Sequence, residues 1–133
     1  SRGLGDVYKR QPYGTAEDDF TVEHIYPQSC VPTPNAGWKR ELESWQVDSR
    51  DMGIRLNRLG NLTLLTFAAN RYIKARPFNA KKNVLENEDP KCPHPILSVS
   101  QSIFGCNQWG PDEIDARTET LTKAFLKRWP NVV

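Results

Sequence analysis

The segment from residue 21 to residue 29, TVEHIYPQS, limits the folds that this chain can adopt more than any other part of the sequence. Residues 20 to 26 are rich in β-branched and aromatic side chains, which predicts a strand from Phe20 to Tyr26, and Pro27 ends it because proline donates no ladder hydrogen bond. Successive side chains of a strand point to opposite faces. Glu23 and His24 therefore point apart, so one of the two side chains can hold a metal ion while the other approaches a nucleophilic water molecule.

A second motif, LGNLTLL, covers residues 59 to 65 and predicts a second strand from Asn61 to Thr66, introduced by a turn at Gly60. The two strands can pair as an antiparallel hairpin across the long connection of residues 27–58. A connection of this length is usually functional or partly structured, and residues 38–44 have a helical pattern. A helix is expected over residues 68–75, since the residue before Pro77 avoids the helical region.

The rest of the chain predicts further helices. One is expected over residues 79–88, followed by a proline-rich segment at residues 89–95. Pro111 opens a terminal helix with acidic residues in its first turn and Lys127 and Arg128 in its last turn, which suits the helix dipole. The fold class expected is α+β, with a two-stranded antiparallel hairpin, a long inter-strand loop and additional C-terminal helices, in a single domain over residues 12–133.

The first residues have an unusual composition. Residues 6–11, DVYKRQ, are the literal translation of a transposon adaptor used in sequencing libraries, so residues 1–11 are expected to be an assembly artefact. A natural polar tail is the alternative. Because the chain also lacks an initiator methionine, we expect it to be the C-terminal part of a longer protein from a metagenomic fragment.

The charge of the chain limits how it could bind nucleic acid, and its cysteine content limits the cellular compartment in which it is expected. Without residues 1–11 the 18 basic and 16 acidic residues become 15 of each, so nucleic-acid binding would depend on how charge is distributed. Three cysteines without a C-x-x-C pair argue against disulfides and a four-cysteine zinc site, although Cys92 and His94 remain an alternative ligand pair. No apolar run approaches the roughly 18 residues of a membrane span. We expect a bacterial cytoplasmic protein with reduced thiols.

Taken together, the ordered motifs resemble the HNH nuclease domain at the C-terminus of GmrSD-type, modification-dependent restriction endonucleases. The resemblance covers roughly residues 20 to 130, and several motifs in register are more specific than any one alone. It rests on Glu23-His24-Ile25 with Pro27-Gln28-Ser29, on LGNLTLL, on Asn70, on Phe78 with Lys81, and on Trp109 with Ile114 and Arg117.

The resemblance implies a His-Me finger (ββα-metal) core and assigns roles to four residues. His24 matches the general base, and a largely neutral imidazole can accept a proton from water, although a lone histidine is often structural. Glu23 and Asn70 match the positions that bind Mg²⁺ or Mn²⁺. Many such sites have aspartate where this chain has Glu23, so direct or water-mediated coordination stays open. Asn61 matches a structural loop tether, with an ordinary turn asparagine as the alternative.

Basic residues around the expected metal-ligand helix are candidates for phosphate contacts, although such a run is often a solvated face. The candidates are Arg71, Lys74, Arg76, Lys81, Lys82 and Arg117. The implied function is a metal-dependent HNH endonuclease that hydrolyses double-stranded DNA, possibly modified, in a restriction or phage-defence system. An NTP-dependent sensing domain would lie upstream. A catalytically weak nucleic-acid-binding module and a plain interaction domain remain the alternatives.

Overall fold

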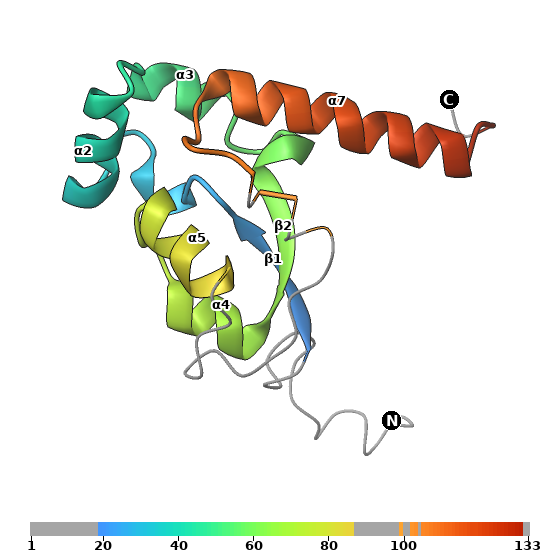
Figure 1. Ribbon diagram of the computed structural model, residues 1–133, viewed down its shortest axis with the longest axis horizontal. Coiled ribbons are helices and arrows are strands. Elements are labelled where there is room, and N and C mark those ends of the chain that lie inside the picture. The colour runs from blue at the N-terminus through green and yellow to red at the C-terminus, as the bar shows by residue number, and fades with distance from the viewer. Residues whose placement is uncertain (1–18, 87–98, 100–101, 104, 132–133) are drawn as a thin grey trace.

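The computed structural model describes residues 19–86, 99, 102–103 and 105–131. In these residues the chain forms a two-stranded antiparallel sheet and several helices, the α+β class that the sequence predicts (Figure 1). The expected artefact at residues 1–11, the proline-rich segment and the pair of Cys92 and His94 lie outside the described residues. None of the described helices is both long and apolar enough to cross a membrane.

The sheet consists of β1 (Phe20–His24) and β2 (Leu62–Thr66), which pair antiparallel and confirm the predicted hairpin across a long connection. β1 is shorter than predicted because Ile25 and Tyr26 leave the ladder and are buried in the core. Ile25 still donates its backbone N–H to the carbonyl of Asn61, 2.8 Å away, just beyond the last strand pair. The end of β1 is thus fixed to the start of β2 by a bond outside the sheet.

The connection between the strands is more ordered than predicted. It contains η1 (Gln28–Cys30), α2 (Ala36–Ser44), α3 (Ser49–Ile54) and η2 (Leu59–Asn61). The expected helix at residues 38–44 is α2, which begins earlier because the side chain of Asn35 accepts a hydrogen bond from the backbone of Trp38 (2.9 Å). The short helix α3 was not predicted, because six residues that include Gly53 give little periodic pattern.

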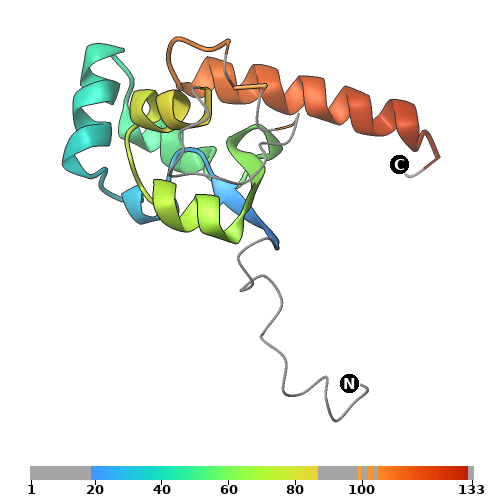
Figure 2. The same cartoon turned by 60° about the horizontal axis from the view of Figure 1, so that its bottom comes forward.

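Two helices follow β2 directly. Thr66, the last residue of the strand, caps α4 (Phe67–Ile73) by accepting a hydrogen bond from Ala69 N (3.2 Å). α4 is followed by α5 (Phe78–Glu86), and the two correspond to the helices predicted over residues 68–75 and 79–88, of which 87 and 88 are not described. The strand–connection–strand–helix order therefore places α4 immediately beside the hairpin, as both views of the ribbon illustrate (Figures 1 and 2).

Aromatic rings join the inter-strand segment to the rest of the core. Tyr26, Trp38, Trp45, Phe78 and Trp109 follow one another in ring contacts with centroids 5.1 to 6.4 Å apart. Tyr26 and the rings of Trp38, Phe78 and Trp109 are fully buried. Burial of such large apolar surfaces supplies much of the stability of a small domain and orders the long connection.

The terminal helix α7 (Pro111–Arg128) begins at the predicted proline. Its first turn is closed by Glu113, whose carboxylate accepts from Gly110 N (2.9 Å). The first half of α7 packs against η2, and its second half projects away from the hairpin (Figures 1 and 2). α7 therefore supports the segment that leads into β2.

Candidate functional site

β1 presents Glu23 and His24 on opposite faces of the hairpin. Glu23 lies opposite Thr63, on the face that also carries buried Leu65. His24 lies opposite Leu62, on the face that carries Val22, which is 54 % exposed. One of the two side chains therefore enters the domain, and the other turns toward solvent.

The inward face of β1 is occupied by Lys81 of α5, whose side chain is only 3 % exposed. Its ammonium donates to Glu23 Oε2 (3.0 Å) and to the backbone carbonyls of His24 (3.1 Å) and Ile25 (2.9 Å). An ammonium has three N–H donors, so all of them are used inside the protein. The expectation that Lys81 contacts DNA is therefore wrong: Lys81 fastens α5 to the end of β1.

Burial controls the electrostatics of this ion pair. It raises the pKa of the Glu23 carboxyl, and the adjacent Lys81 ammonium offsets part of that rise. Burial also lowers the pKa of Lys81, against the attraction of Glu23. In both groups desolvation outweighs the attraction, so each charge depends on the other to remain buried.

On the outward face of β1, the imidazole of His24 makes one polar contact within the described residues. Nε2 of His24 lies 2.8 Å from Oδ1 of Asn57, an exposed residue between α3 and η2. Sequence reasoning missed Asn57, because nothing in its local pattern distinguishes it from an ordinary loop asparagine. Only the fold brings it to a residue 33 positions away.

Asn61, expected to tether the loop, is fully buried and makes side-chain bonds to three parts of the chain. Its Oδ1 accepts from Tyr26 N (2.8 Å) and Trp109 Nε1 (3.0 Å). Its Nδ2 donates to the carbonyls of Tyr26 (3.1 Å) and Leu56 (2.8 Å). The amide thus joins both ends of the inter-strand segment to each other and to the segment that precedes α7.

Asn70, the second expected metal ligand, lies on α4, which packs against both strands. Its side chain is half-buried, and among the described residues its amide makes no hydrogen bond to Glu23 or His24. Among the described residues no cluster of three His, Cys, Asp or Glu side chains could hold a metal ion. A cation held here would therefore rely on few protein oxygens and on water, which is how Mg²⁺ is usually bound.

The remaining basic candidates differ in their surroundings. Arg71 and Lys74 are exposed, and the guanidinium of Arg71 lies over the ring of Phe67 at 5.5 Å. Arg76 is half-buried over the ring of Tyr72 at 4.7 Å. Lys74 ends α4 with a positive φ of 53°, which is uncommon for a residue with a side chain.

Lys82 and Arg117 both donate hydrogen bonds to backbone carbonyls of the protein. Lys82 is half-buried and donates to the carbonyl of Cys106 (2.7 Å). Arg117 of α7 is 7 % exposed, and burial lowers its pKa. Its Nη1 donates to the carbonyls of Gly60 (2.8 Å) and Leu62 (2.7 Å). The expected DNA contact by Arg117 is therefore wrong, because its guanidinium links α7 to the start of β2.

Comparison with known proteins identifies one family. Comparison with curated proteins and with solved structures finds no match. The family model described as GmrSD restriction endonucleases, C-terminal domain, matches residues 4–124. Since the match spans most of the chain, this chain belongs to the family of C-terminal domains of GmrSD restriction endonucleases.

Proposed function

We propose that this nuclease domain is a metal-dependent HNH endonuclease that hydrolyses DNA phosphodiester bonds, with His24 as its general base. The observation that carries the proposal is the end of β1, where Glu23 faces inward and His24 faces solvent in a chain of this restriction-endonuclease family. The order β1, ordered connection, β2 and α4 supports a His-Me finger core. The geometry of the site supports the proposed residue roles, which the family alone would not assign.

In the proposed reaction His24 takes a proton from the attacking water. A neutral imidazole accepts a proton on one nitrogen while the other is held by a hydrogen bond. The 2.8 Å hydrogen bond between Nε2 of His24 and Oδ1 of Asn57 would hold that second nitrogen. His24 also lies on the solvent-facing side of the hairpin, where a nucleic acid can approach.

Glu23 and Asn70 would hold Mg²⁺ or Mn²⁺. A carboxylate and an amide oxygen are the hard donors that these ions prefer, and the two residues lie on elements that pack together. When bound, the ion would stabilise the charge that develops on the phosphate and on the departing oxygen. Lys81 keeps the Glu23 carboxylate in place and neutralised by an ion pair until then.

Three exposed or half-buried basic residues after β2 are the proposed contacts to double-stranded DNA. Arg71, Lys74 and Arg76 lie on or just after α4, next to the proposed metal ligand Asn70. Phosphate contacts of this kind fix the register of a protein on the duplex. We further propose that this domain is the cutting part of a modification-dependent restriction or phage-defence system, with modified DNA sensed by an NTP-dependent domain elsewhere in the intact protein.

The test compares the parent chain with His24→Ala and Asn70→Ala in plasmid nicking and in Mn²⁺ calorimetry. Loss of the base should reduce the nicking rate by roughly 10² to 10⁴ and leave Mn²⁺ binding intact. Asn70→Ala should lose both. Asn107→Ala, which changes an exposed asparagine far along the chain, is the control and should behave as the parent.

Three outcomes would contradict the proposal in different ways. Equal Mn²⁺ binding by His24→Ala and Asn70→Ala would overturn the metal assignment. DNA binding without nicking by the parent, at any divalent ion tested, would favour the catalytically weak binding module. Binding of neither DNA nor Mn²⁺ would favour a plain interaction domain.

A further inference from the structure

We infer that Asn57 is a positioning residue for His24: its side-chain oxygen fixes the imidazole in the tautomer and orientation that leave Nδ1 free to accept a proton. The inference rests on the proposed role of His24 as a base. It adds a residue that the sequence motifs do not contain, from the segment between α3 and η2.

The direction of the hydrogen bond determines which nitrogen is free. An amide oxygen only accepts, so a contact of 2.8 Å between Nε2 and Oδ1 requires the proton to sit on Nε2. In a neutral imidazole the lone pair then lies on Nδ1. If the amide were turned so that its nitrogen donated to Nε2, Nδ1 would carry the proton and neither nitrogen could accept one from water.

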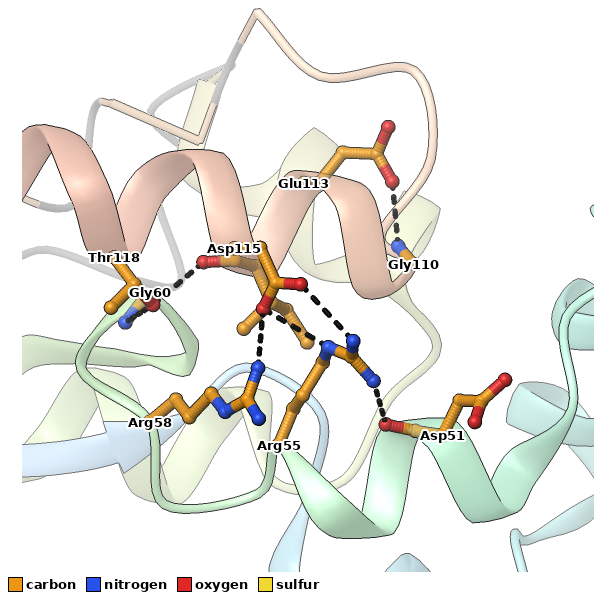
Figure 3. A network of polar contacts seen from close by, with 9 residues as sticks. Asp51, Arg55, Arg58, Gly60, Gly110, Glu113, Asp115 and Thr118 are labelled. Atoms are coloured by element: carbon orange, nitrogen blue, oxygen red, sulfur yellow. Dashed lines mark hydrogen bonds and ion pairs between the residues drawn. The ribbon is translucent and has the colours of Figure 1, made fainter.

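Ion pairs and a backbone turn hold the segment that carries Asn57, before and after that residue. Its neighbours Arg55 and Arg58 both bind Asp115 of α7: Arg55 through Nε (3.0 Å) and Nη2 (3.1 Å), and Arg58 through Nη1 (2.7 Å) (Figure 3). Arg58 also donates its backbone N–H to the carbonyl of Arg55 (3.0 Å), which closes a turn around Asn57. The segment around Asn57 is therefore tied to α7 by the ion pairs with Asp115 and closed by a backbone turn.

Two further contacts connect this turn to the end of β1. The carbonyl of Leu56, next to Asn57, accepts from Asn61, which also binds both backbone groups of Tyr26. α7 approaches Gly60 so closely that a β-carbon there would clash with the carbonyl oxygen of Ile114. These contacts thus hold His24 and Asn57 in place relative to each other. A general base needs such support, because its acceptor nitrogen must be placed accurately against the water molecule.

Because Asn57 is exposed, an experiment can distinguish a positioning role of this residue from a structural one. A single hydrogen bond between solvent-exposed groups contributes little to stability, because water replaces it when it is lost. Removing the Asn57 amide should therefore leave folding nearly unchanged and act on the reaction. Since the residue has no role in metal binding, Mn²⁺ affinity should not change either.

The experiment uses the parent chain, Asn57→Ala and Asn57→Asp, with Asn107→Ala as a matched exposed-asparagine control. In Asn57→Ala, kcat for nicking should fall about 10- to 100-fold, the range for losing a partner that orients an active-site ligand, while KM and the melting temperature stay constant. Asn57→Asp keeps an acceptor oxygen at the same place and should restore most of the rate.

A second readout does not need turnover. The chain has only two histidines, so ¹⁵N spectra of histidine-labelled protein can be assigned with His24→Gln, at about pH 8 where an imidazole is largely neutral. The Nε2–H tautomer of His24 should be more populated in the parent and in Asn57→Asp than in a free side chain. In Asn57→Ala it should relax toward the ratio of a free side chain.

The two readouts separate the inference from the proposed function. An unchanged tautomer ratio in Asn57→Ala overturns the inference, and so does an unchanged kcat. If the parent does not cut DNA but the tautomer ratio changes as expected, the proposed function fails while Asn57 still orients His24.

Discussion

Glu23 and His24 are neighbours in sequence, yet the two faces of β1 give them opposite surroundings. On the inner face, Glu23 pairs with Lys81, whose side chain is 3 % exposed and whose three donors are all used. On the outer face, the imidazole of His24 makes one hydrogen bond within the described part of the chain, to the exposed Asn57. A low local dielectric makes the inner pair costly to break, whereas water can replace the outer contact.

This difference assigns separate tasks to the two faces. The inner pair holds the end of β1 to α5, so changes there should be seen first in folding. The outer pair contributes little to folding, so changes there should be seen in the reaction. Substitutions on the two faces should therefore differ in whether they affect folding or the reaction.

The largest effect should follow Lys81→Met, which keeps the length of the side chain but removes its charge. Breaking a buried ion pair by removing one partner costs about 3 to 5 kcal/mol, because the other charge stays buried without compensation. Urea unfolding followed by tryptophan fluorescence measures the change. The matched control is Lys82→Met, which removes one hydrogen bond to Cys106 and should cost only about 0.5 to 1.5 kcal/mol. Equal losses in the two variants would contradict the separation.

A double-mutant cycle should sharpen the comparison. If Glu23 and Lys81 depend on each other, Glu23→Gln combined with Lys81→Met should cost less than the sum of the single changes, with a coupling of about 1 to 3 kcal/mol. The equivalent cycle for His24→Gln and Asn57→Ala should give a coupling in stability below about 0.5 kcal/mol. A larger coupling on the outer face would mean that His24 and Asn57 are part of the folding core.

The smallest effect on folding is expected for the exposed lysine at the end of α4. Lys74→Gln should change the free energy of unfolding by less than about 0.5 kcal/mol, as is usual for surface substitutions. If Lys74 contacts a phosphate, the same change should flatten the logarithmic salt dependence of DNA binding by about 0.9. Fluorescence anisotropy across a salt titration measures the slope. An unchanged slope would place the path of the DNA over another surface.

Much of the fold was accessible from local patterns. The hairpin, α4, α5 and the start of α7 were predicted from β-branched runs, proline and glycine positions and charged helix ends. The short helix α3 was missed because local propensity in six residues is weak and packing decides it. The strand ends were displaced because Ile25 and Tyr26 gain more by entering the core than by extending the ladder.

The helical spacing of apolar residues in the sequence indicates that two basic residues point into the core. Phe78, Lys81 and Leu85 are the buried residues of α5, at the spacing of one helix face. Arg117 likewise follows Ile114 by three positions, and both are buried on α7. Helical periodicity thus placed both cations on the core side, although composition alone suggested a surface for binding DNA.

Local sequence patterns were enough to predict the α+β hairpin with its helices, the family, and the placement of Glu23 and His24 on opposite faces, because a strand has a fixed alternation and motifs are local. The contacts that each face makes came from the packing of distant elements. It brought Lys81 to Glu23 from 58 positions away and Asn57 to His24 from 33 positions away. Such partners depend on how α5, α7 and the inter-strand segment pack, and packing is set by the summed burial of the whole core rather than by any local pattern.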